Sequence, residues 1–266
     1  MREYKNFWDR NAGRYDCFMR KDRRVYEKMY ELIRPVVKDK TVLELATGTG
    51  LIAKNIVNAA VHIEATDASS EMITEAKRNN HSVKLYFSVQ DMFSRPYADK
   101  SFDVVIVSNA LHIVPLPEKA LAEIRRVLKD GGVLIAPTFT HAENSFSGKV
   151  KAFFMKLAGF PLHNKWTSEG YLSFLQQNDW TVQKSVVLKA SFPLTYAECV
   201  KTSASLHGVL QGAEICQQGG RGPSGGRILE IAGSRISGIG CGFFNRCRSC
   251  HGVFDRHEAA HRTCFL

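Results

Sequence analysis

The feature that most limits the fold of this 266-residue chain is a regular alternation of two kinds of segment. Short runs rich in β-branched and aromatic residues are separated by helix-length segments with apolar residues on one face. Such alternation favours an open parallel sheet with helices on both faces. Asp130–Gly132 should end the last of these helices, because glycine accepts the left-handed conformation. The expected strands are Thr41–Ala46, Val61–Thr66, Val83–Ser88, Phe102–Ser108 and Val133–Thr138, and the expected helices are Leu51–Ala59, Ser70–Asn79 and Pro117–Lys129.

The last expected elements of this sheet form a hairpin. After a helix that begins near Thr167, two strand-like runs, Trp180–Lys189 and Leu194–Lys201, are joined by Ala190–Pro193. So short a connection pairs strands antiparallel. The sequence therefore predicts an α/β fold, a doubly wound, seven-stranded and mostly parallel sheet with an antiparallel last strand, completed near residue 201.

The composition changes near residue 203. The chain from residue 204 onward has no lysine and 7 arginines, and it holds 12 of the 20 glycines and 5 of the 7 cysteines. It has no clear helical or strand periodicity, and Gly219–Gly226 is typical of a flexible linker. We therefore expect residues 1–201 to form the functional domain and residues 202–266 to be an irregular extension, disordered or foreign to the rest.

One cluster in this extension has spacing typical of zinc ligands. Cys247-x-x-Cys250 is followed by His257-x-x-x-His261. The gap between the two pairs is shorter than in the usual finger, and no strand or helix pattern flanks it. The sequence therefore predicts no metal site.

The sequence Glu44–Gly50, ELATGTG, follows the first expected strand directly and opens a helix. Glycines let the backbone turn sharply and approach a ligand, and a helix N-terminus offers free N–H groups to an anionic group. Asp67 ends the second expected strand, 67 − 48 = 19 residues after Gly48, where a carboxylate can accept both hydroxyls of a ribose. These residues predict a site for a cofactor that contains an adenosyl group.

Two classes of cofactor fit this loop. Gly48, Gly50 and Ala53 match the dinucleotide fingerprint, which would make the chain an NAD-dependent oxidoreductase. Glu44 lies in the strand before the loop, where it can reach an ammonium group. Asp91 follows the third expected strand, where it can accept from an adenine amino group. These two carboxylates and the terminal hairpin favour S-adenosylmethionine (SAM).

Five segments in order resemble the motifs of class I SAM-dependent methyltransferases: ELATGTG, ATDAS, SVQDMF, FDVVIVSNALHIV and RVLKDGG. They are most similar to the small-molecule enzymes that include the ubiquinone, menaquinone and phospholipid types, and the resemblance covers about residues 4–201. It implies that the loop glycines contact the methionine part of SAM, that Asp67 holds the ribose, and that Asp91 with Met92 frames the adenine. It also implies that the N-terminal segment closes over the cofactor, with Tyr15 near its carboxylate.

Simpler roles for these residues stay open. The glycines could form only a tight turn, Asp67 could cap a helix, although Ser69 could do so in its place, and Asp91 could be a plain loop carboxylate. The family usually has glycine where this chain has Ala46, a small change that should not block binding. The residues predicted to bind the cofactor are Tyr15, Glu44, Ala46, Gly48, Gly50, Asp67, Ala68, Met72, Asp91, Met92 and Ser108.

Methyl transfer from SAM is an in-line displacement in which the protein mainly aligns the reactants and excludes water. A general base is needed only if the acceptor must lose a proton. Ligands lie at the carboxyl ends of the strands, so His112, after the fourth strand, and His141, after the fifth, are the candidate bases. Packing, or a hydrogen bond within its loop, explains His112 equally well.

Two apolar groups surround this expected site. The first lies between the fifth strand and the hairpin, where relatives build the acceptor pocket, and its lining would suit a lipid or a quinone, although core packing also explains it. The second lies at the N-terminus and either closes over the cofactor or packs as the stripe of a helix. The first group is Phe153, Phe154, Met155, Phe160 and Trp166. The second group is Phe7, Trp8, Tyr15, Phe18 and Met19.

The predicted function is SAM-dependent methyl transfer to a small acceptor, apolar or lipid-like. A non-catalytic SAM- or nucleotide-binding regulatory module and an NAD-dependent oxidoreductase are the alternatives. No apolar run approaches the roughly 20 residues that span a bilayer, and no secretory signal is present, so a cytoplasmic protein is expected. The net charge of +10 is spread along the chain, which does not favour a nucleic-acid partner and leaves contact with a membrane surface open. Neither the acceptor's identity nor the oligomeric state follows from the sequence.

Overall fold

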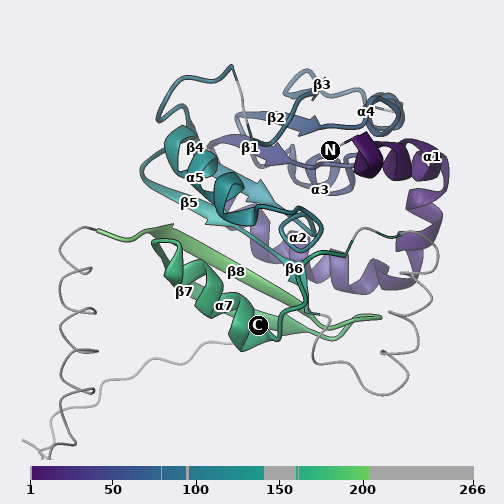
Figure 1. The fold of residues 1–266 in the computed structure, drawn as a ribbon. Coiled ribbons are helices and arrows are strands. Elements are labelled where there is room, and N and C mark those ends of the chain that lie inside the picture. The colour runs from purple at the N-terminus through teal and green to yellow at the C-terminus, as the bar shows by residue number, and fades with distance from the viewer. Residues whose placement is uncertain (1, 79, 94–95, 141–159, 161, 204–266) are drawn as a thin grey trace, which may run out of the picture. The chain divides into compact units, whose positions relative to one another are not determined.

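The computed structural model describes residues 2–203 apart from 79, 94–95, 141–159 and 161 (Figure 1). Contacts within the chain divide it into residues 1–217 and 218–266, and all the described residues belong to the first unit. The irregular extension predicted for residues 202–266 lies almost wholly outside the described residues, as do its cysteine and histidine pairs. That part of the domain organisation stays a prediction.

One eight-stranded sheet forms the centre of the fold (Figure 1). Its order is β3-β2-β1-β4-β5-β8-β6, and β7 pairs with β8. Strands β1 to β5 run parallel, whereas β8 is antiparallel to β5, β6 and β7. The strands are β1 Thr41–Leu45, β2 His62–Asp67, β3 Leu85–Val89, β4 Phe102–Val107, β5 Leu128–Ile135, β6 Thr138–Phe139, β7 Trp180–Leu188 and β8 Leu194–Lys201.

The helices are short apart from two at the N-terminus. Two of them start at side-chain caps: Ser69 Oγ accepts from Met72 N at 3.1 Å, and Thr167 Oγ1 accepts from Gly170 N at 3.0 Å. The helices are α1 Arg2–Met19, the 3-10 helix η1 Arg20–Asp22, α2 Arg23–Val37, α3 Leu51–Ile56, α4 Ser70–Lys77, α5 Pro117–Val127 and α7 Ser168–Gln177.

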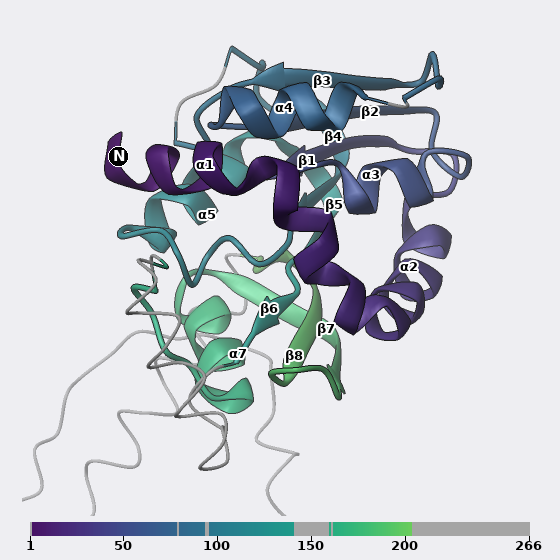
Figure 2. The same ribbon diagram turned by 90° about the vertical axis from the view of Figure 1, so that its right-hand side faces the viewer.

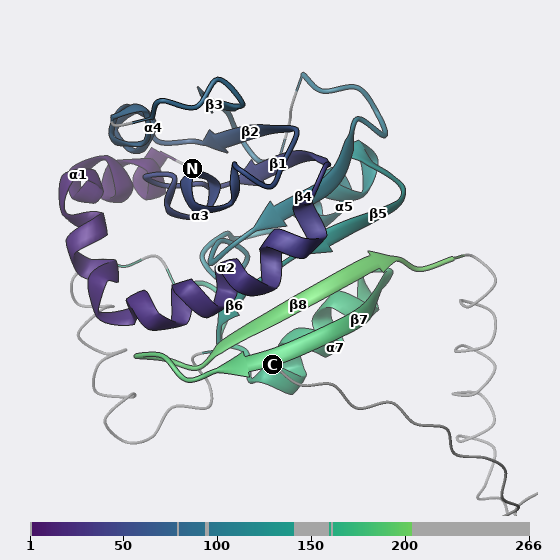
Figure 3. The same cartoon turned by 180° about the vertical axis from the view of Figure 1, so that it is seen from behind.

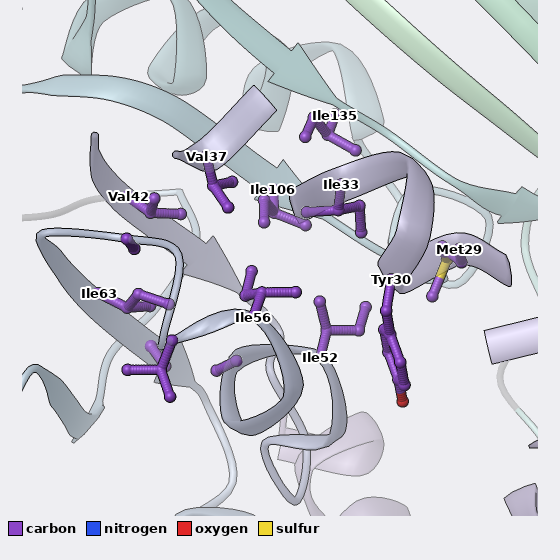
Figure 4. Close-up of a cluster of buried hydrophobic side chains, with 14 of the residues drawn as sticks. Met29, Tyr30, Ile33, Val37, Val42, Ile52, Ile56, Ile63, Ile106 and Ile135 are labelled. Carbon is purple, nitrogen blue, oxygen red and sulfur yellow. The ribbon is translucent and has the colours of Figure 1, made fainter. Parts of the chain in front are cut away.

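Each face of the sheet is covered by its own set of helices. Val42 of β1 packs against α2 and α3, and its neighbour Leu43 points to the opposite face, against α5 and α7. Figure 3 shows α2 and α3 on the first face, and Figure 1 shows α5 and α7 on the second. Figure 4 shows the first cluster, in which Ile33 of α2 lies near Ile106 of β4 and Ile135 of β5. The predicted doubly wound sheet with its closing antiparallel hairpin is confirmed.

Three details differ from the sequence prediction. Strand β6 adds an eighth, two-residue strand. Helix α5 ends at Val127, because Leu128 already pairs with Phe102 of β4 and begins β5. Gly131 does have a left-handed φ of 73°, but it lies within β5, where the pairing with β4 shifts register, and it does not end the helix.

Helix α2 was not predicted, although the sequence contains its signal. Its buried residues recur at spacings of three and four, which places them on one helical face. They are Val25, Tyr26, Met29, Tyr30, Ile33 and Val37. In the described part of the chain, no helix has both the length and the apolar character needed to cross a membrane.

We expect Leu43→Ala to lower the free energy of unfolding by about 2–5 kcal/mol, because the side chain is fully buried in the central strand and its loss leaves a cavity. The same substitution at Leu116, which is 41% exposed, should cost less than about 1 kcal/mol. Urea denaturation measures both. Equal losses would contradict the assignment of Leu43 to the core.

Candidate functional site

Helix α1 crosses the carboxyl ends of the parallel strands, which face the viewer in Figure 2. Two hydrogen bonds attach it there. Asp9 Oδ1 accepts from Ser69 Oγ, at the start of α4, and Asp16 Oδ1 accepts from Thr49 Oγ1, in the loop after β1, each at 2.5 Å. The helix therefore covers the edge of the sheet where open α/β folds bind ligands.

The loop after β1 has an unusual backbone. Ala46, Gly48 and Gly50 have positive φ angles of 50°, 58° and 77°. A backbone bond from Thr47 N to Thr66 O at 2.9 Å attaches the loop to β2, and a bond from Gly50 N to Thr47 O at 3.0 Å closes its turn. A left-handed alanine is strained, which gives a physical reason for the glycine that the family usually has at this position.

Asp67 joins this loop to the end of β2. Its Oδ2 accepts from Gly48 N and its Oδ1 from Ser69 N, both at 2.9 Å. Burial raises the pKa of Asp67, and the two backbone N–H groups oppose that shift. The carboxylate thus lies at the end of β2, one strand from the switch point between β1 and β4, where it shapes the loop and keeps acceptor capacity for a ligand.

A cavity of about 410 Å³, called here the cofactor cavity, lies over this loop. It brings together nine of the residues predicted to bind the cofactor: Tyr15, Ala46, Gly48, Asp67, Ala68, Met72, Asp91, Met92 and Ser108. Its wall also contains residues that were not among those predicted to bind the cofactor, most of them within the same motifs: Trp8, Ser69, Val89, Gln90, Phe93, Asn109, Ala110, Ile113, Val114 and Pro115.

Two predicted residues do not line this cavity. Glu44 is 2% exposed beneath the loop, and burial raises its pKa to about 8. At Gly50, a Cβ atom would lie only 2.7 Å from Phe87 Cζ, so this glycine is required by packing as well as by its φ. For both residues a direct contact with the cofactor stays a prediction.

Two buried polar atoms indicate that the cofactor cavity suits a polar ligand. Ser108 Oγ and Gln90 Oε1 belong to residues of its wall, and neither has a hydrogen-bond partner within the described ranges. Leaving such atoms unpaired costs about 1–3 kcal/mol each. Together with the carboxylates of Asp67 and Asp91, they fit a cofactor with hydroxyl and amino groups.

A second cavity, of about 340 Å³, is called here the aromatic cavity. Phe160 lines it as predicted for the acceptor pocket, but Trp166 does not, because its ring packs on Phe174 at 4.8 Å and Tyr171 at 5.3 Å. Phe153–Met155 lie outside the described residues. The rest of the wall comes largely from α1 and its neighbours: Phe7, Trp8, Asn11, Arg14, Tyr15, Phe18, Met19, Lys21, Asp22, Asn109, His112, Phe139 and Phe192.

His112 lines the aromatic cavity and is 1% exposed. Its Nδ1 lies 2.8 Å from Thr138 Oγ1, and its ring stacks on Phe160 with centroids 6.4 Å apart. The position suits contact with an acceptor, while a catalytic role stays a prediction. His141, the other candidate base, lies outside the described residues.

The two cavities adjoin. Trp8, Tyr15 and Asn109 line both of them. Asn109 has a φ of 51°, and its side chain is fixed on both sides, by donation to Tyr26 Oη at 3.0 Å and acceptance from Phe139 N at 3.1 Å. The two cavities therefore meet at three shared side chains, of which Asn109 is fixed by hydrogen bonds.

Comparisons with known proteins agree with this arrangement. Residues 43–136 match a family model described as a methyltransferase domain. Demethylmenaquinone methyltransferase of Thermotoga maritima is 34% identical over 157 residues, which cover 56% of this chain and 67% of that protein. The protein of the same name from Renibacterium salmoninarum is 38% identical over 105 residues, 40% of this chain and only 44% of the relative. The DhpI–SAH complex has the same fold, with a TM-score of 0.61 and 22% identity over 76% of this chain and 96% of that one.

We expect Gly50→Ala to destabilise the protein more than Gly131→Ala. Both glycines are left-handed, so each substitution costs about 1–2 kcal/mol, but only at Gly50 does the new Cβ meet Phe87, whereas nothing lies within 4 Å of it at Gly131. Urea denaturation should show a further loss of about 1–3 kcal/mol for Gly50→Ala, partly restored by adding Phe87→Leu. Equal losses would rule out the contact.

The raised pKa of Glu44 predicts a pH dependence of stability. Between pH 4.5, its ordinary pKa, and about pH 8, the folded protein holds a proton that the unfolded chain has released. Stability should therefore fall as pH rises through this window, by at most about 1.4 kcal/mol per pH unit. Glu44→Gln should remove this decline, whereas Glu31→Gln, on an exposed carboxyl, should keep it. Unfolding measured at several pH values distinguishes them, and an unchanged slope in Glu44→Gln would refute the explanation.

Proposed function

Because this chain belongs to the class I SAM-dependent methyltransferases, we propose that it moves a methyl group from SAM, bound in the cofactor cavity, to a small acceptor bound in the aromatic cavity. The observation that carries the proposal is that the two cavities adjoin at Trp8, Tyr15 and Asn109. A donor on one side and an acceptor on the other would then be held in contact and away from water, which is the main requirement of the reaction.

The residues of the cofactor cavity fit the parts of SAM. Asp67 would accept from the ribose hydroxyls, Asp91 from the adenine amino group, and Ser108 would pair its unpartnered Oγ with a polar group of the cofactor. Tyr15 lies against the loop, 3.6 Å from the position of a Cβ on Gly48, so it would border the methionine part. When bound, the cofactor supplies a methyl group activated by a positively charged sulfur.

The aromatic cavity supports an apolar, ring-containing acceptor. Its wall is rich in phenylalanine, and flat ligands stack well on such side chains. The two relatives named above are demethylmenaquinone methyltransferases, which act on a quinone-type molecule by their names. His112 would act as a general base only if the acceptor loses a proton, with Thr138 Oγ1 fixing the orientation of its ring.

Calorimetry with SAM, S-adenosylhomocysteine and NAD tests the cofactor. We expect the first two to bind and NAD not to bind. Asp67→Asn should weaken SAM binding about tenfold or more, because the hydrogen bonds to the ribose lose their charge. Asp39→Asn, on an exposed side chain that lines neither cavity, is the matched control. Binding of NAD without SAM would overturn the proposal.

A screen for methyl release across quinone, lipid and amine acceptors tests the reaction itself. Transfer to at least one apolar ring compound is the expected result. Binding of SAM without transfer to any acceptor would instead support a regulatory SAM-binding module.

A further inference from the structure

We propose that the acceptor carries an acidic group, a carboxylate or a phosphate, which Arg14 and Lys21 bind at the aromatic cavity. The inference rests on the proposed function, since it takes the aromatic cavity as the acceptor site. The acceptor would then need a negative charge in addition to the apolar ring that the aromatic cavity favours.

Both cations lie on the wall of the aromatic cavity. The lining residues Phe7, Asn11, Arg14, Phe18 and Lys21 follow one another at spacings of four and three, as residues on one face of a helix do. This face of α1 and η1 therefore presents aromatic rings and positive charges to the same ligand.

The positive charges of these two residues are not neutralised by a neighbouring acid. Within the described residues, neither Arg14 nor Lys21 has an ion pair or hydrogen bond, and Lys21 Nζ lies 3.9 Å from the centroid of the Phe18 ring. Asp22, an acidic residue of the described wall, accepts from Ser191 N at 2.8 Å and from Ser191 Oγ at 2.9 Å.

Three basic residues elsewhere on α1 and α2 do have a partner. Arg10 donates to Asn6 O, Arg23 pairs with Glu27 at 2.8 Å, and Arg34 donates to Asn55 O. The unpaired charges of this region thus include the two that line the cavity.

An acidic acceptor would complete this arrangement. Arg14 and Lys21 are exposed, but the aromatic rings of the wall cover one side of an anion held between them. Such an anion is screened less than it would be on an open surface. The guanidinium of Arg14 can bind a carboxylate or a phosphate through two parallel hydrogen bonds, and Lys21 adds a second, more mobile charge. A neutral acceptor of the same shape would gain only the stacking.

Three naphthalene compounds of equal ring size test the charge requirement on the full chain saturated with S-adenosylhomocysteine. Calorimetry should show that 2-naphthoate, 2-naphthyl phosphate or both bind at least about tenfold more tightly than 2-naphthalenemethanol. The stronger of the two anions identifies the acidic group. Added salt should weaken the anions and leave the alcohol unchanged. An alcohol that binds as tightly as both anions would overturn the proposal.

Matched double variants locate the effect. Arg14→Gln with Lys21→Gln should reduce the anions to the affinity of the alcohol, and the alcohol itself should be unaffected. Arg10→Gln with Lys28→Gln removes the same charge from exposed positions outside the cavity, so it should keep the preference. Equal loss in both variants would show a general effect of net charge and refute the site.

SAM binding, measured on the same samples, separates this inference from the proposed function. A protein that binds SAM and transfers a methyl group but shows no preference for the anions contradicts the acidic acceptor alone. A protein that does not bind SAM contradicts the proposed function itself.

Discussion

The rest of the site depends on the two hydrogen bonds that the carboxylate of Asp67 accepts from the backbone. With one oxygen on Gly48 N and the other on Ser69 N, it ties the loop after β1 to the start of α4, and so fixes two neighbouring strand ends. The left-handed conformations of Ala46 and Gly48 are kept because the loop is anchored on both sides. The cofactor cavity lies over these two strand ends and is also lined by residues that follow β4.

Helix α1 supplies the part of the cavity walls that the sheet and its loops do not. Its carboxylates at Asp9 and Asp16 bind hydroxyls of the same two loops, so the helix is positioned by the cofactor loop and by the cap of α4. Once attached, it places Trp8 and Tyr15 between the two cavities. Side chains of this one helix form part of the wall of both cavities. A change in how α1 is attached would therefore alter the shape of both.

Sequence patterns predicted the wall of the cofactor cavity far better than that of the aromatic cavity. Asp67 and Asp91 could be assigned to one site because they follow neighbouring parallel strands, whose carboxyl ends meet at one edge of the sheet. Asn109 follows β4 in the same way and was expected at that edge. Arg14 carries no such signal, since its place on a cavity wall depends on where α1 packs against the sheet. For Trp166 the sequence left both a pocket and a core position open, because the two look alike in sequence, and its packing on Phe174 favours the core.

The hydrogen bonds from Ser191 to Asp22 join segments 169 residues apart. Contacts so distant along a chain form late in folding, because the intervening loop must close first. Among the residues that the structure describes, those lining the cofactor cavity lie between Trp8 and Pro115, whereas the wall of the aromatic cavity also includes Phe192. During synthesis on a ribosome, the donor half can therefore assemble while the closing hairpin is still being made. Each new molecule would gain its cofactor site before its acceptor site.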